Sequence, residues 1–210
     1  MSTISNDLRK ARSALKRYGL LLQSDPKLPN VASIVAGEAI RGSWWSHLRC
    51  HDIHAVISRI ASDPDVVITK LISGKITYVQ RELWPALVAV ACSHEPWQRR
   101  GISQAARRLL KIVNQRGPLR TDHLQWPRTA KRSPGDAARE LERKLLVHGQ
   151  DIHTERGTHA KYVESWQHWS SRVRVSKARV KPDDGKRTFE QIVGDLNNRF
   201  GANATLPWAR

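Results

Sequence analysis

The second half of the chain carries an ordered series of helix and strand patterns that restricts the possible folds more than any other feature. Apolar residues recur at helical spacing over residues 103–115, a short helix is indicated over 121–124, and Ser133-Pro134 is a cap followed by proline before a third helix over 135–146. The runs LLVHGQDIHTE and THAKYVESW then alternate like strands and are joined through Arg156-Gly157. We therefore expect three helices followed by a β-hairpin over 152–163.

Helix, helix, helix, hairpin is the element order of a winged helix. The segment GISQAARRLLKIVNQRGPLRTDHL, followed by AARELERKLLV and the hairpin, resembles the winged-helix superfamily of bacterial DNA-binding proteins over about 70 residues. That resemblance implies that the 135–146 helix enters the major groove of duplex DNA and that the 152–163 hairpin is the wing.

The first half of the chain also reads as helical, with one hairpin. Helix patterns cover residues 5–18, 31–40, 44–61 and 85–93, and two β-branched runs separated by Ser73-Gly74 predict a hairpin over 66–80. TYVQRELW at 77–84 and KYVESW at 161–166 repeat one local pattern, which suggests tandem winged-helix-like units. The predicted fold class is mainly α with two small β-hairpins, that is, α+β.

Breaks in the pattern of predicted helices and strands divide the chain into three predicted regions. HEPWQRRG at 94–101 combines Pro, Gly and two arginines, which are typical of a boundary. We expect a helical unit with a hairpin over 1–97 and a winged-helix domain over 98–170. The remaining residues, 171–210, are predicted to form a basic linker and a C-terminal helix, after which Leu206 and Trp208 dock on the body of the protein.

The charge of the chain points to a polyanionic partner. Lys and Arg number 36 against 19 Asp and Glu, which gives a net charge of +17 and a pI near 10.8. Residues 1–97 carry net +4 and residues 98–210 carry net +13, so the excess lies in the second half. We expect nucleic acid as the partner, duplex DNA first. Basic charge that serves only solubility is the alternative interpretation.

The cations that a winged helix would turn toward DNA form three groups. Arg139, Arg143 and Lys144 avoid the apolar stripe of the 135–146 helix and are expected to point into the major groove. The preceding link and the wing supply cations for phosphates on either side, namely Arg128, Lys131, Arg132, Arg156 and Lys161.

Two other clusters are candidate sites. Trp44 and Trp45 follow Gly42-Ser43 at an expected helix start, where they could stack on an unpaired base, although core packing is the alternative. His47, His51 and His54 fall on one face of the 44–61 helix, but the glutamate of the HExxH motif is replaced by Leu48. We expect no metal site and no cofactor. The lack of a long apolar stretch or an export signal predicts a cytoplasmic protein without a membrane span.

Two further functions stay open. The helix-rich first half and the possible tandem units make the chain similar to the bacterial winged-helix DNA glycosylases, which excise alkylated or crosslinked bases. The catalytic Q-x-Q pair of that family has no counterpart, because no two glutamines lie two positions apart, so no catalytic residue is assigned. An RNA-binding protein is the third hypothesis, because net charge does not distinguish RNA from DNA.

Overall fold

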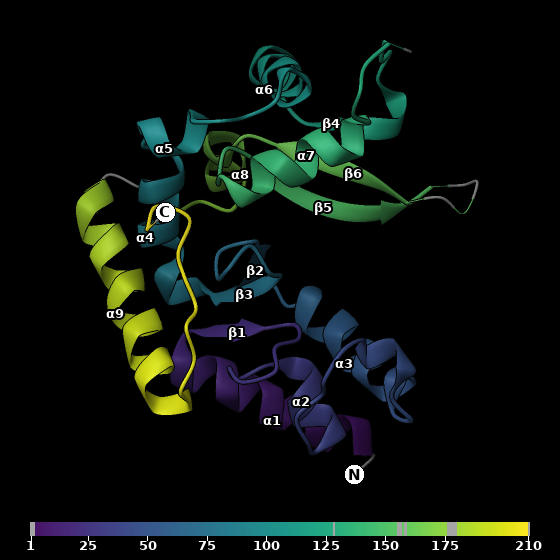
Figure 1. Cartoon of the computed structure of the whole chain (residues 1–210), viewed down its shortest axis with the longest axis vertical. Helices are drawn as coiled ribbons and strands as arrows, with labels where there is room; N and C mark the ends of the chain where they lie inside the picture. Colours follow the sequence, from purple (N-terminus) through teal and green to yellow (C-terminus); the bar gives the residue numbers. More distant parts are fainter. Residues whose placement is uncertain (1–2, 128, 155–156, 158, 176–179, 210) are drawn as a thin grey trace. The chain divides into compact units, whose positions relative to one another are not determined.

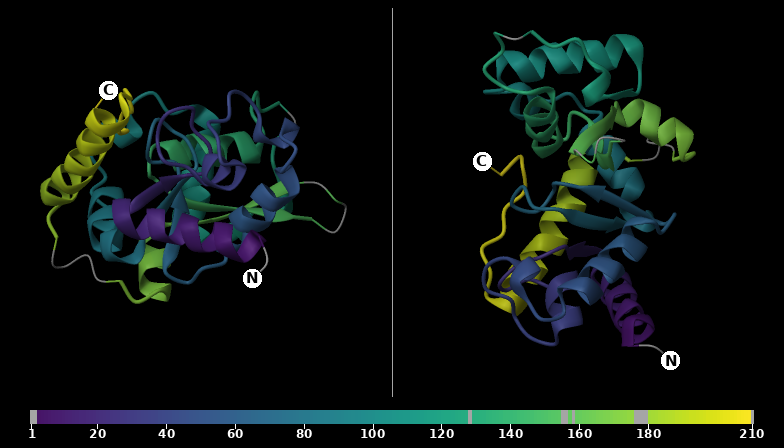
Figure 2. Two further views of the ribbon diagram at one scale, coloured as in Figure 1. Left: turned by 90° about the horizontal axis from the view of Figure 1, so that it is seen from below. Right: turned by 90° about the vertical axis from the view of Figure 1, so that its right-hand side faces the viewer.

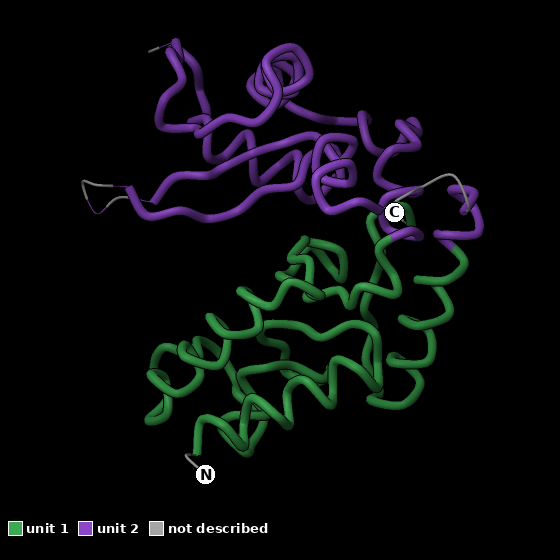
Figure 3. The backbone as a smooth tube through the Cα atoms, turned by 180° about the vertical axis from the view of Figure 1, so that it is seen from behind, with its two compact units in different colours: residues 1–84, 187–210 green, residues 85–186 purple. Residues whose placement is uncertain are grey.

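The computed structural model describes residues 3–127, 129–154, 157, 159–175 and 180–209, and these form two compact units (Figure 3). Unit 1 comprises residues 1–84 and 187–210, and unit 2 comprises residues 85–186. These limits differ from the predicted ranges 1–97, 98–170 and 171–210. The stretch 85–97 packs within unit 2, and the C-terminal residues return to unit 1.

Unit 1 places helices against a small sheet, both shown in Figure 1. Strand β3 lies between β1 and β2 and is antiparallel to both. The buried faces of the first three helices and Tyr78 of β3 form the core. Its elements, in chain order, are α1 (Thr3–Tyr18), β1 (Leu20–Leu22), α2 (Val31–Ala36), the 3-10 helix η1 (Trp44–Ser46), α3 (Cys50–Ala61), β2 (Val66–Thr69), β3 (Thr77–Gln80) and the 3-10 helix η2 (Arg81–Leu83).

Unit 2 repeats this strand order. Its central strand β6 lies between β4 and β5 and is antiparallel to both. The elements, in chain order, are α4 (Trp84–Ala91, whose first residue belongs to unit 1), α5 (Pro96–Arg99), α6 (Gln104–Arg116), β4 (Leu119–Arg120), the 3-10 helix η3 (Thr121–His123), α7 (Pro134–Arg143), β5 (His148–His153), β6 (His159–Glu164) and α8 (Trp166–Arg172). The fold class is therefore α+β, with a three-stranded antiparallel sheet in each unit of the described chain.

Both predicted hairpins and the caps of the second half are confirmed. Ser103 accepts a hydrogen bond from the Ala106 amide at the start of α6, and Ser133 accepts one from the Asp136 amide at the start of α7. The strands pair over Val66–Thr69 with Thr77–Gln80 and over His148–His153 with His159–Glu164. Local signals were sufficient here, because caps and turns act within a few residues.

The predicted helix over 44–61 is wrong at its start. The first residues form the 3-10 turn η1, and α3 begins only at Cys50. Trp44 is buried in the core of unit 1, whereas Leu48 is 100% exposed. The spacing of Trp44 and Leu48 imitated a helical stripe, but the two side chains do not share a face.

Other expectations about the elements are also corrected. The 31–40 helix stops at Ala36, because Gly37 takes a left-handed conformation and caps it. The short helix over 121–124 is a 3-10 turn with strand β4 before it. Strand β1 and helix α8 do not follow from the sequence patterns. In the 171–210 part, predicted as a basic linker and a C-terminal helix, the helix is α9 (Pro182–Phe200).

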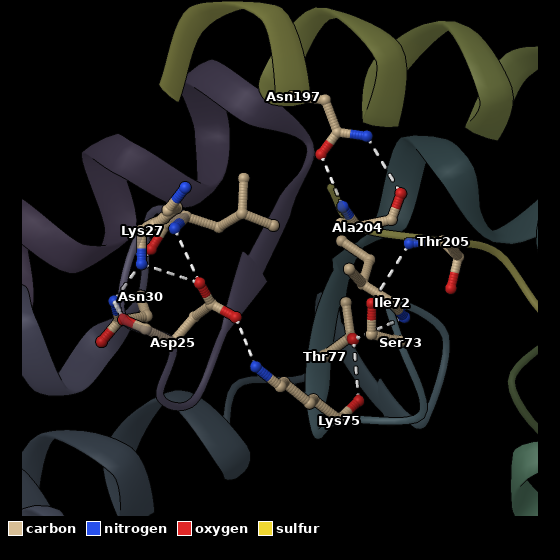
Figure 4. Close-up of polar contacts among 11 residues, drawn as sticks. Asp25, Lys27, Asn30, Ile72, Ser73, Lys75, Thr77, Asn197, Ala204 and Thr205 are labelled. Carbon is tan, nitrogen blue, oxygen red and sulfur yellow. Dashed lines mark hydrogen bonds and ion pairs between the residues drawn. The ribbon is translucent and has the colours of Figure 1, made fainter. Parts of the chain in front are cut away.

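The C-terminal segment docks on unit 1, as expected. It runs back beside α9, as Figures 1 and 2 show. Asn197 both donates to the Ala204 carbonyl (2.9 Å) and accepts from its amide (2.8 Å), as Figure 4 shows. At the turn between β2 and β3, the Ser73 amide donates to the Thr205 carbonyl, and the Thr205 amide donates to the Ser73 hydroxyl. Leu206 is buried and Trp208 donates to Glu190, so both residues are fixed.

A buried ion pair ties α7 to the sheet of unit 2. The Lys161 ammonium of β6 lies 2.9 Å from a carboxylate oxygen of Glu142, and the two residues are only 3% and 5% exposed. Asp151 of β5 approaches the same ammonium to 3.1 Å. Gly149 leaves room for the pair, because a Cβ there would lie 2.3 Å from the Glu142 oxygen.

We predict that Lys161→Ala lowers the free energy of unfolding by about 3–5 kcal/mol, because Glu142 would lose the counter-charge that Lys161 supplies in the interior. Urea unfolding followed by circular dichroism measures the change. Lys131→Ala, which removes an exposed lysine of the same unit, is the matched control and should change stability by less than about 0.5 kcal/mol. Similar values for the two variants would contradict a stabilising role for the buried pair.

Candidate nucleic-acid interface

A basic groove lies between α6 and the segment that leads to α7. Its volume is about 720 Å³, and no acidic side chain is among the residues that line it. We call it the α6 groove. Its cationic and aromatic lining residues are Arg107, Arg108, Lys111, Trp126, Lys131 and Arg132. The neighbouring Arg128 lies outside the described residues.

Helix α6 presents its cations because its other face is fixed in the core. Ala106, Leu109 and Val113 are buried, and they recur at intervals of three and four residues. The same periodicity turns Arg107, Arg108 and Lys111 outward, where all three are exposed. The sequence shows this split of α6 into two faces, but the groove itself depends on the 124–132 segment, whose residues 126, 127 and 129–132 line it beside the helix.

Trp126 is held in a defined orientation in the α6 groove. Its indole N–H donates to the carbonyl of Arg132 at 2.9 Å, and the ring packs in part against the core of unit 2. The guanidinium of Arg108 lies 5.7 Å from the ring centre, within cation–π range. A rigid indole bordered by cations results.

Glu140 joins the start of α6 to α7 beside the groove. Its carboxylate accepts from the Ser103 amide (2.6 Å) and hydroxyl (2.7 Å), and it pairs with Arg132 at 3.2 Å. The charge of Arg132 is thereby partly balanced. In contrast, no acidic side chain of the described chain pairs with Arg107, Arg108, Lys111 or Lys131.

The outer face of α7 carries two of the predicted arginines. Arg143 is exposed and has no acidic partner in the described chain. Arg139 is also exposed and pairs with Asp136 at 2.7 Å. The hydrogen bond from Arg139, and after it that from Ser133, lowers the pKa of Asp136 to about 2. Asp136 therefore stays ionised at neutral pH and remains the partner of Arg139.

Lys144 and Lys161, two other predicted DNA-binding cations, are not on the exposed face of α7. Lys144 donates to the Trp97 carbonyl at 3.4 Å, so it lies beside α5 and not on the outer face of α7. The expectation of Lys161 on the wing surface is wrong, because this residue is buried in its ion pair with Glu142. Arg156 lies outside the described residues, as Arg128 does.

The tryptophan pair is split between core and surface. Trp44 is 7% exposed and packs in the core, so it is not available to stack on a base. Trp45 is 60% exposed and stacks on Trp44 with ring centres 4.0 Å apart. Of the two predicted stacking residues, Trp45 alone has a solvent-exposed ring.

The three histidines predicted to share a helix face, His47, His51 and His54, do not lie on one helix. His47 precedes α3 and pairs with Glu38, whereas His51 and His54 lie within the helix. In the part of the chain that the structure describes, no three His, Cys, Asp or Glu side chains group in a way that could hold a metal ion.

A buried histidine–carboxylate pair lies at the base of the hairpin in unit 2. Glu164 of β6 is fully buried, accepts a hydrogen bond from Arg172 of α8, and lies 3.3 Å from the ring nitrogen Nδ1 of His148. Burial alone would raise the pKa of Glu164, but the hydrogen bonds from His148 and Arg172 outweigh it and hold that pKa below its ordinary value. The strand pattern of the sequence gives no sign of this pair, because it places these residues on the surface of a hairpin.

Comparison with known protein families gives one match for this chain. Residues 6–200 match the family model described as AlkZ related. The chain belongs to the AlkZ-related family. AlkZ is a DNA glycosylase-like family, which links this AlkZ-related protein to proteins of the DNA-repair type. No curated protein and no solved structure matches the chain. Among its described residues, no helix is both long and apolar enough to cross a membrane.

We predict that acid removes the contribution of Glu164 to stability. Since its pKa is lower in the folded chain than the ordinary 4.5, this contribution is complete above about pH 5 and is lost as the pH falls through the folded value. Glu164→Gln should therefore be less stable than the wild type near pH 7, and the gap should narrow toward about pH 3. Urea unfolding at both pH values tests this, and a gap independent of pH would contradict it.

Proposed function

We propose that this AlkZ-related protein binds duplex DNA through unit 2, acting as a winged-helix module. In this proposal α7 lies in the major groove, the β5–β6 hairpin is the wing, and cations beside α7 contact phosphates. The observation that carries the proposal is the grouping of exposed cations without acidic partners, Arg143 of α7 with Arg107, Arg108, Lys111 and Lys131 of the α6 groove, on one unit.

The topology of unit 2 supports this assignment. The chain runs through α6, β4, η3 and α7 before the hairpin, and β4 pairs with the far strand of that hairpin. A winged helix has this order, and its last helix before the hairpin is the one that reads DNA. Glu142 faces inward to Lys161, so the outer face of α7 is left to Arg139 and Arg143.

The ion pair of Arg139 does not prevent DNA binding. Arg139 and Asp136 are each about half exposed, at 47% and 48% of their side chains, and ion pairs at such positions contribute about 0–1 kcal/mol. A phosphate or a guanine edge can therefore replace Asp136 as the partner of Arg139 at little cost. Lys144 and Lys161 are not part of the proposed contact surface, because they are bound inside unit 2.

Membership of the AlkZ-related family favours a second candidate function, the excision of a damaged base. The glutamine pair of the glycosylases that the chain resembles is missing, so the proposal assigns no catalytic residue. Release of a free base from a duplex that contains an alkylated purine would establish this second function. Competition between a blunt duplex and a structured RNA would separate both candidates from RNA binding.

We predict that changing both Arg139 and Arg143 to Ala weakens binding to a blunt 30-base-pair duplex and reduces its salt dependence. Removing one cation from a DNA phosphate should lower the slope of log affinity against log salt by about 0.9, so the slope should fall by up to about 1.8 in the double variant. Fluorescence anisotropy over a salt series measures both quantities.

The matched control removes two exposed cations of α1, Arg9 and Lys16, and so makes the same change in net charge. It should leave the slope and the affinity close to those of the wild type. Equal losses of affinity in the two double variants would mean that net charge, and not the face of α7, determines binding. Wild-type binding that does not respond to salt would exclude phosphate contacts altogether.

A further inference from the structure

We infer that the α6 groove binds an unpaired DNA strand, with one base stacked on Trp126 and its phosphates held by the cations of α6 and by Lys131. This inference rests on the proposed function and makes it more specific. It identifies the preferred substrate as a DNA duplex that adjoins a single-stranded stretch.

The lining of the α6 groove matches the chemistry of a single strand. Arg107 and Lys111 lie one turn apart along α6, and Lys131 lines the same groove from the 124–132 segment. A groove that combines a row of cations with an aromatic side chain is the usual arrangement for unpaired nucleic acid, since phosphates and base faces recur along the strand. A ligand with anionic groups alone, and no planar base, would have nothing to stack on Trp126.

The size of the groove also suits an unpaired strand. Pockets of roughly 300–1,000 Å³ bury most of a molecule of drug size, and a nucleotide is in that class. The α6 groove, at about 720 Å³, has room for a nucleotide. A base inside a duplex is covered on both faces by its neighbours, whereas an unpaired base offers Trp126 a free face.

Trp126 is ordered before any ligand arrives. The hydrogen bond to the Arg132 carbonyl fixes its ring, and Arg108 is already in cation–π range. Binding then costs little side-chain entropy, which favours stacking on this residue over stacking on a freely rotating one.

Glu140 places the groove next to the face of α7 that we assign to the duplex. It is a residue of α7, and its carboxylate contacts Ser103 at the start of α6 and Arg132 of the groove wall. Two binding surfaces of different character thus lie side by side in unit 2. A junction between duplex and single strand supplies a ligand for each of them, the duplex for α7 and the single strand for the α6 groove.

The test compares a 12-nucleotide single strand, a blunt duplex and a duplex with a single-stranded extension by fluorescence anisotropy. Trp126→Ala should weaken binding to the single strand about 10-fold, as expected when one base no longer stacks, and Trp126→Phe should restore most of it. The double change of Arg107 and Lys111 to Ala should weaken the same interaction at least as much and reduce its salt dependence. Both sets should weaken binding to the blunt duplex much less than they weaken binding to the single strand.

Two comparisons separate this inference from the proposed function. The α7 variant, with Arg139 and Arg143 changed to Ala, should lose the blunt duplex and keep the single strand, and the Arg9 and Lys16 double variant should keep both. Because Arg107 and Lys111 are exposed, their double variant is expected to fold even if Trp126→Ala does not.

Single-strand binding within about twofold of the wild type in the Arg107 and Lys111 variant would overturn the inference and leave the proposed function intact. Equal weakening of single-strand and duplex binding in that variant would also overturn it, because the groove would then serve the duplex. Failure of the wild type to bind the blunt duplex would instead refute the proposed function.

Discussion

The buried ion pair of Glu142 and Lys161 determines which side chains of α7 are exposed to solvent. The carboxylate of Glu142 on α7 pairs with the ammonium of Lys161 on β6 in the interior of unit 2. Gly149 of β5 leaves room for the Glu142 side chain, because it has no Cβ. Breaking such a pair is costly, because either charge alone is poorly solvated in the interior. The pair therefore fixes the rotation of α7 about its own axis. Together with Ala137, Ala138 and Leu141, Glu142 forms the buried side of α7, and Arg139 and Arg143 are left on its exposed side.

Glu140 makes the corresponding contact on the other side of α7. It accepts from the backbone and the hydroxyl of Ser103 and so holds the start of α6, while Arg132 joins it from the groove wall. One helix thus anchors both the sheet and the α6 groove through two glutamates in its last turns. These acidic residues, which would repel DNA if they were exposed, are used for internal contacts. The cations that remain unpaired account for the positive character of this unit.

Much of the fold could be predicted from local signals in the sequence. Ser103 and Ser133 cap helices, and the turns at Ser73-Gly74 and near Gly157 join hairpin strands, because these features depend on neighbouring residues. The repeated strand order of the two units also agrees with the short repeated pattern seen in the sequence. The start of α3 could not be predicted in this way, since Trp44 enters the core from a 3-10 turn and only tertiary packing decides this.

The candidate site was less predictable, because it depends on contacts between distant residues. Lys161 reads as a surface cation on a strand, and nothing near it in the sequence reveals that Glu142 lies within reach of its ammonium. The cations of Arg107, Arg108 and Lys111 could be placed on the polar face of α6, but their groove requires Trp126 to lie beside them. The charge of the sequence thus indicates only which half of the chain carries the excess of cations, whereas burial decides which of these cations are exposed to a ligand.

Hydrogen exchange measured by mass spectrometry tests the central claim most directly, with and without a duplex that carries a single-stranded extension. The account predicts slower exchange on DNA binding in the peptides that contain α7, the start of α6 and the 124–132 segment, and unchanged exchange in α1. Protection that is absent from unit 2, although the DNA is bound, would contradict the account.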